Sequence, residues 1–199
     1  EAKKLAEKGV KEIMLIARNK EKENIVEFLL YMWQVEDIIR AYHFDINLIQ
    51  IGLIDKHDVP QEVKYEMREW YQRIIDEMLK EGSSERGHIG RVKFVMSEIQ
   101  HLHLQLLTVW QDKKYMASYE KASPYIQDLY RKSAGLVVQE TEVCLNALYG
   151  LLLLKLKKTT ISRETTDALK TISEMLAYLA ANYKLYRSGK LDISKEKSN

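Results

Sequence analysis

The sequence predicts an all-α protein, a single-domain helical bundle of about five main helices joined by short connecting helices. Apolar residues recur every three or four positions over long stretches, which is the spacing of one face of an α-helix. No segment alternates apolar and polar residues as a half-buried strand would. The 199 residues include only two Pro and eight Gly, too few turn-forming residues for an all-β fold with many hairpins.

Residues 24–45 predict the central helix of the bundle, ending near Tyr42. At about 100° per residue, one side of this helix is continuously apolar, and further apolar residues widen that side. The residues on the inward arc are Ile25, Phe28, Leu29, Met32, Val35 and Ile39. A helix that is apolar over so much of its circumference is surrounded by other elements. Glu36 interrupts the apolar arc.

Two further helices follow in the first half of the chain. Asp45 can cap a short helix that ends near Gly52. Asp58 and Pro60 then mark the start of a longer helix, because Pro is tolerated near the first helical position. Gly82 is a typical C-terminal stop for that helix.

The second half of the chain predicts three long helices. Ser83 or Ser84 caps the first, whose inward arc runs to Trp110, and residues 112–122 are polar helix or loop. The second begins at Ser123-Pro124 and carries the longest apolar pattern, through Leu154. The last follows a turn at residues 157–162, with Ser162 as its cap and Gly189 as its end.

The domain boundaries follow from these patterns. Residues 1–13 carry little apolar surface and begin with Glu, so we interpret them as an N-terminal extension with a processed or engineered start. Met14 would then be the native initiator. We expect the helical bundle domain to span residues 14–188 and residues 189–199 to form a disordered tail.

Composition excludes several classes of protein. Charged residues nearly cancel, with a net charge of +2, which disfavours a dedicated nucleic-acid binder. Cys144 is the single cysteine, so no internal disulfide points to an oxidising compartment. The run Leu151–Leu154 is short and is closed by lysines, so it predicts a buried helix and no membrane span. We therefore expect a cytoplasmic protein.

Three ionisable side chains on three predicted helices point toward the apolar interior: Glu36, His103 and Glu140. The structural interpretation is a buried polar network. Glu36 and Arg40 have the i, i+4 spacing of a favourable helix pair, and His103 would bond a carboxylate or a carbonyl. In this interpretation Glu36, Arg40, His103 and Glu140 approach one another, no residue is catalytic and no cofactor is needed.

The alternative is a site for one divalent metal. One His and two carboxylates, here His103, Glu36 and Glu140, would suit iron, manganese or zinc. A dinuclear carboxylate centre is disfavoured, because Glu98 and His101 form a single Glu-x-x-His motif that faces the polar side of its helix.

Two stretches of sequence resemble a known family. The run MLIARNKEKENIVEFLLYMWQVEDIIRAYHFDINLI, from Met14, is similar to the opening of the uncharacterised bacterial helical proteins grouped as domain of unknown function 4924. The stretch GHIGRVKFVMSEIQHLHLQLL, residues 87–107, is similar to the middle of that family. The resemblance covers residues 14 to 187, implies an all-helical fold and a cytoplasmic bacterial setting, and transfers no catalytic residue.

Three functions compete on these observations. The leading hypothesis is a non-enzymatic protein-interaction or structural module that forms a homo-oligomer, most simply a twofold homodimer. The alternative is a metal- or small-ligand-binding bundle that uses the inward Glu, His and Glu set. A second alternative is weak nucleic-acid binding through the lysine-rich turn at residues 155–163.

Overall fold

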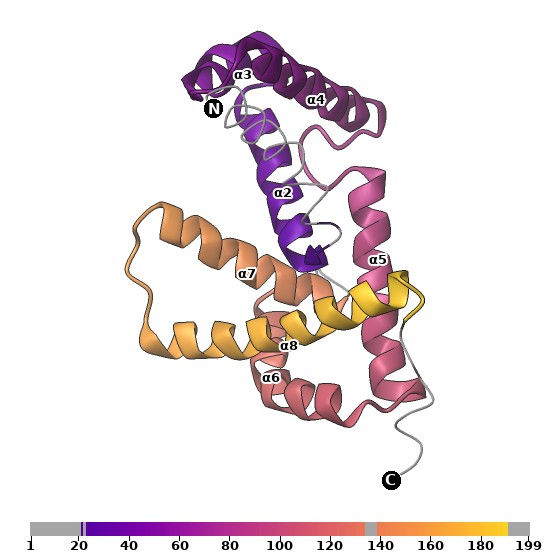
Figure 1. Cartoon of the computed structure of the whole chain (residues 1–199). Helices are drawn as coiled ribbons and strands as arrows, with labels where there is room; N and C mark the ends of the chain where they lie inside the picture. Colours follow the sequence, from indigo (N-terminus) through magenta and orange to yellow (C-terminus); the bar gives the residue numbers. More distant parts are fainter. Residues whose placement is uncertain (1–20, 22, 134–138, 191–199) are drawn as a thin grey trace, which may run out of the picture. The chain divides into compact units, whose positions relative to one another are not determined.

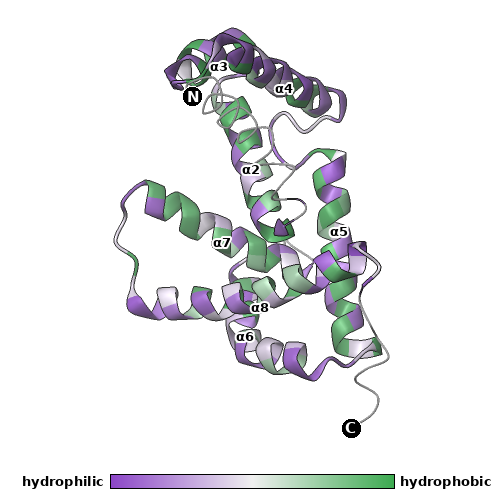
Figure 2. Cartoon of the chain, in the orientation of Figure 1, coloured by the Kyte–Doolittle hydropathy of each residue, from purple (hydrophilic) through white to green (hydrophobic). Residues whose placement is uncertain are grey.

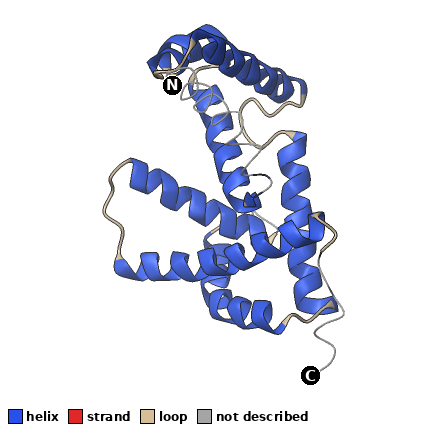
Figure 3. Ribbon diagram, viewed as in Figure 1, coloured by secondary structure: helices blue, strands red, loops and turns tan. Residues whose placement is uncertain are grey.

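The computed structural model describes residue 21 and residues 23–133 and 139–190. The described residues form seven α-helices, a short 3₁₀-helix and one π-helical turn, with no strand among them (Figure 3). The predicted all-α fold is confirmed. The predicted extension, residues 1–13, and residues 191–199 of the predicted tail lie outside the described residues.

Contacts between residues divide the chain into two compact units. Of the described residues, 21, 23 and 27–93 belong to the N-terminal unit, and 24–26, 94–133 and 139–190 belong to the C-terminal unit. The single domain over residues 14–188 stays a prediction.

The N-terminal unit contains α2 (Ile25–Ala41) from Glu27 onward, α3 (Ile46–Gly52), the 3₁₀-helix η1 (Ile54–Lys56) and α4 (Gln61–Lys80) (Figure 1). The helix predicted within residues 24–45 is confirmed, and the residues of its predicted inward arc are buried. Asp45 caps α3 as expected, since its carboxylate accepts from the N–H groups of Asn47 and Leu48.

The predicted ends of α4 are close to the observed ones. Pro60 immediately precedes the helix, where its missing N–H costs nothing. Gly82 has a positive φ of 68°, which glycine adopts without strain, and it follows the last turn. The N–H of Ser83 then bonds to the carbonyl of Met78 at 2.9 Å and closes the helix end.

The start predicted for the next helix is wrong. Helix α5 (Gly90–Leu104) begins six or seven residues after the expected caps Ser83 and Ser84. Both the N–H and the hydroxyl of Ser83 bond to the carbonyl of Met78, so Ser83 ends α4 and begins no helix. Gly87 has a φ of 83°, and this left-handed residue separates the two helices.

The C-terminal unit contains α5 from Phe94 onward, the π-helical turn η2 (Gln105–Val109), α6 (Lys113–Lys132), α7 (Glu140–Leu156) and α8 (Arg163–Arg187). Helices α6, α7 and α8 all contact one another. The expected cap at Ser162 is confirmed, because its hydroxyl accepts from the N–H of Thr165. Gly189 follows α8 with a positive φ, as expected.

The predicted helix start at Ser123-Pro124 is also wrong. Pro124 lies inside α6, which begins after Asp112, whose carboxylate accepts from the N–H of Tyr115 at 2.7 Å. The buried residues of α6 lie seven and four positions apart, which defines one helical face; they are Tyr115, Ala122 and Ile126. The long pattern from residue 123 to 154 therefore belongs to two helices.

Figure 2 shows that the hydropathy of α7 differs from that of α8. Helix α7 is apolar along most of its length, whereas the first half of α8 is largely polar. Among the helices described here, none has both the length and the apolar character needed to cross a membrane.

Candidate functional site: the His103 hydrogen-bond network

His103 is fully buried near the end of α5, just before the π-helical turn. Its Nδ1 lies 2.7 Å from the hydroxyl of Tyr115 on α6, and its Nε2 lies 3.0 Å from Oε2 of Glu140 on α7. The rings of Tyr115 and Tyr119 meet the imidazole edge-on. One buried side chain thus connects three helices of the C-terminal unit.

Glu140 is the first residue of α7, and both of its carboxylate oxygens have partners. Oε2 faces His103, and Oε1 accepts from the hydroxyl of Tyr119 at 3.1 Å. The pKa of Glu140 is lowered, and the hydrogen bond from His103 is the largest cause. The bond from Tyr119 also lowers this pKa, whereas partial burial of the carboxylate raises it. Glu140 is therefore ionised at neutral pH, and Nε2 of His103 must be a donor.

The tyrosines of the network stay protonated. Burial raises the pKa of Tyr115 and of Tyr119, and the charge of Glu140 raises both further. A neutral tyrosine can donate to Glu140 and can bond the second ring nitrogen of His103. With every polar atom of the imidazole paired, the network satisfies a histidine that would be costly to bury alone.

Glu36 lies in the N-terminal unit and has different partners. It is fully buried, its Oε2 lies 2.5 Å from Nδ1 of His88, and its Oε1 accepts from the N–H of Ile89 at 2.9 Å. The His88 ring stacks on Trp33, with centroids 4.6 Å apart. Glu36 therefore holds the residues that lead into α5.

Arg40 holds the same connecting segment from one turn further along α2. Its guanidinium pairs with Asp37 at 2.9 Å and donates to the backbone carbonyls of Ser83, at 3.1 Å, and Gly87. The i, i+4 spacing predicts that Arg40 pairs with Glu36, but in the structure its acidic partner is Asp37. The segment is not helical, so these carbonyls receive no N–H from a following helical turn, and the guanidinium of Arg40 satisfies them instead.

The structure thus brings together part of the predicted site. His103 and Glu140 are directly bonded in the C-terminal unit, whereas Glu36 and Arg40 belong to the N-terminal unit. The approach of all four side chains stays a prediction. Glu36 and His103 are both buried, as the helical spacing indicates, and Glu140 is partly exposed.

In the part of the chain that the structure describes, the side chains around His103 do not form a metal site. Among the residues that the structure describes, no group of three or more His, Cys, Asp and Glu is placed to hold one. Both ring nitrogens of His103 are already engaged, so a metal would have to displace Tyr115 or Glu140. Glu98 accepts from Tyr183 at 2.7 Å and does not pair with His101 in a ligand motif.

Sequence reasoning missed three residues of these networks: His88, Tyr115 and Tyr119. A signal existed for the tyrosines, because Asp112 is a good N-cap and Tyr115, Tyr119 and Ala122 are spaced as one helical face. No local signal pairs His88 with Glu36, since they lie 52 residues apart.

The fold and the network define a class: an all-α protein in which a buried His, bonded to Tyr and Glu side chains, joins three helices. The chain belongs to the family described as Domain of unknown function (DUF4924), whose model matches residues 14–190. Searches of curated proteins and of solved structures found no match to the chain. The family description carries no activity, so function has to be argued from the structure.

Proposed function

We propose that this protein is a non-enzymatic interaction module that binds a second copy of itself through the distal half of α7. The observation that carries the proposal is the incomplete burial of that half. In the proximal half, Val143, Cys144 and Leu145 are buried. In the distal half, Leu154 is 38% exposed and Leu156 is 59% exposed.

An apolar stretch of this kind is normally covered in the functional assembly. Residues 151–154 are four consecutive leucines, and none of them is buried by the described residues. A helix that is apolar on all sides needs neighbours on all sides. The described part of the chain does not supply them at the end of α7.

Gly150 indicates which face of α7 meets the partner. A methyl group added at Gly150 would meet no described atom within 4 Å, so packing among the described residues does not require a glycine there. Glycine inside a helix costs about 0.5–1 kcal/mol relative to alanine. Close approach of another backbone is a reason to keep it, as at helix pairs in which small residues line the contact.

The residues beside Gly150 complete a seam along α7. They recur at intervals of three and four positions, the spacing of a helix–helix contact. The members of this seam are Asn146, Ala147, Gly150, Leu153, Leu154 and Lys157. A second copy of the same seam can pack against it around a twofold axis at Gly150, because an isologous interface must be self-complementary.

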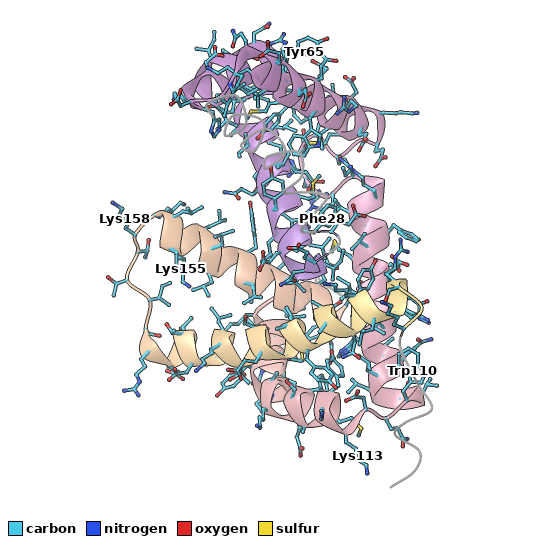
Figure 4. All side chains as sticks on the ribbon, in the orientation of Figure 1. Phe28, Tyr65, Trp110, Lys113, Lys155 and Lys158 are labelled. Carbon is cyan, nitrogen blue, oxygen red and sulfur yellow. The ribbon has the colours of Figure 1, made fainter. Side chains whose placement is uncertain are left out.

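Charges favour the antiparallel arrangement. Acidic Glu142 stands in the first turn of α7, and Lys155, Lys157 and Lys158 stand at its end. Lys155 and Lys158 mark the loop end of α7 in Figure 4. A twofold axis at Gly150 places residue 158 of one copy opposite residue 142 of the other, so lysines meet an acid. We therefore prefer this role for the lysines to nucleic-acid binding, because a net charge of +2 disfavours a nucleic-acid binder.

The proposal includes the cellular setting. We propose a bacterial, cytoplasmic protein, on the resemblance described above and on its single cysteine, which is buried and has no disulfide partner.

Light scattering with size-exclusion chromatography tests the association. We expect a dimer at micromolar concentration for the wild type and a monomer for Leu154→Arg, which adds a buried charge to the seam. Leu185→Arg is the matched control, since Leu185 on α8 is 42% exposed against 38% for Leu154. A monomeric wild type, or equal behaviour of the two variants, would overturn the proposal.

A further inference from the structure

A cleft lies on the surface of the C-terminal unit, beside the His103 network. Its volume is about 580 Å³, within the usual range for small-molecule sites. It is lined by Leu107, Met116, Tyr119, Glu120, Ser123, Pro124 and Gln127. All of these residues belong to the π-helical turn η2 or to α6, so the cleft is independent of the α7 seam.

Two irregularities of the backbone shape this cleft. In η2 the N–H of Trp110 bonds to the carbonyl of Gln105, five residues back, at 2.8 Å, and the widened turn carries Leu107. Such π turns are frequent at functional sites. In α6 Pro124 has no N–H, so the carbonyl of Glu120, four residues earlier, lacks its helical donor. Trp110 and Lys113 in Figure 4 bracket the turn between η2 and α6.

Glu120 is the one charged residue of the lining, which contains no Lys or Arg, and the amide of Gln127 donates to the hydroxyl of Ser123 within the cleft. Glu120 contributes an exposed carboxylate and the carbonyl without a helical donor. Tyr119 contributes an aromatic ring, and its hydroxyl is already held by Glu140 at 3.1 Å and by Ser123. Leu107, Met116 and Pro124 form the apolar wall.

We propose that this cleft binds a small organic cation, a primary amine carried on an apolar or aromatic body. The ammonium group would lie at Glu120, where the carboxylate, together with the carbonyl that receives no N–H from Pro124, can accept hydrogen bonds from it. The Tyr119 ring supplies a cation–π contact, and its orientation is fixed by the bond to Glu140. The apolar body would lie against Leu107, Met116 and Pro124. The His103 network would then have a role in binding, because its bond from Tyr119 to Glu140 holds the Tyr119 ring in the wall of the cleft.

An NMR titration with phenethylammonium tests the proposal, with 3-phenylpropionate as an anion of similar size. We expect the amine to bind and the carboxylate not to bind, because the lining offers the anion no positive group. Affinity for the amine should fall roughly tenfold in Glu120→Gln, which loses the charge-assisted bond, and further in Glu120→Lys. Raising the salt concentration should weaken binding of the wild type.

Glu174→Gln is the control, since Glu174 is an exposed acid on α8 that is absent from the lining. It should bind the amine as the wild type does. Circular dichroism will verify that each variant is folded, which is expected because Glu120 is exposed. The proposal is overturned if the amine does not bind, if the carboxylate binds equally well, or if Glu120→Gln and Glu174→Gln behave alike.

Discussion

At the scale of single residues, His103 holds three helices together through hydrogen bonds. Its ring joins α5 to α6 through Tyr115 and to α7 through Glu140. Removing one partner leaves a buried ring nitrogen without a hydrogen bond, which costs more than the bond itself contributes. Substitutions in this network should therefore affect stability before they affect anything else.

Tyr115→Phe is the sharpest of these substitutions, because it keeps the buried ring and removes only the hydroxyl that faces Nδ1. We expect the free energy of unfolding to fall by about 1–3 kcal/mol. Urea titration followed by circular dichroism measures it, with Tyr125→Phe as a control at a 37% exposed position. Equal effects of the two substitutions would show that the His103–Tyr115 bond does not stabilise the fold.

Glu140 should make stability depend on pH. Its pKa in the folded protein lies below the ordinary value of 4.5. Its bonds therefore stabilise the protein fully above that pH, and the contribution is lost as the pH falls through the folded pKa. Glu140→Gln should be less stable than the wild type at pH 7, and the difference should shrink at pH 3. A difference that is unchanged or larger at pH 3 would contradict this sign.

Glu164→Gln provides the comparison for that experiment, because Glu164 is also an acid in the first turn of a helix but is exposed. It reports the general effect of removing a charge near a helix N-terminus. Only the excess effect of Glu140→Gln belongs to the network.

At the scale of the elements, local sequence signals predict helix ends well where the cap is local. Asp45, Gly82 and Ser162 each act within a few residues of the helix they bound. Local signals fail at the start of α5, because the residue before that helix, Ile89, is held by Glu36, which lies 53 residues away in the sequence. Local signals fail again at Pro124, because α6 continues through this proline, and its buried face extends from Tyr115 before it to Ile126 after it.

The candidate site shows the same limit. The helical spacing correctly places Glu36 and His103 on buried faces. It carries no information on which buried group meets which, because His103 and Glu140 are 37 residues apart and belong to different helices. Periodicity identifies a buried face, and only the packing of the helices identifies the partner.

Gly150 permits a prediction about α7 itself. In a monomeric Leu154→Arg background, Gly150→Ala should raise the free energy of unfolding by about 0.5–1 kcal/mol, since alanine favours the helix and meets no described atom. Chemical denaturation measures this change. A loss of stability would mean that another part of the same chain packs against Gly150, and the argument for a second copy there would fail.

At the scale of the whole molecule, the central claim is that two copies pair along α7 around a twofold axis at Gly150. The axis places each residue 150 next to its equivalent in the partner. Two cysteines at this position would lie at the short Cα separation, about 4.4–6.8 Å, that a disulfide requires. The native Cys144 does not interfere, because it is buried and burial raises the pKa of its thiol to about 12.

Oxidative cross-linking of Gly150→Cys is therefore the most direct test. At micromolar concentration under mild oxidant, we predict that most of the chain migrates as a reducible dimer on a non-reducing gel. Lys170→Cys, on the exposed face of α8, and the wild type should remain monomeric on the same gel. If Gly150→Cys cross-links no better than Lys170→Cys, the twofold pairing along α7 is wrong.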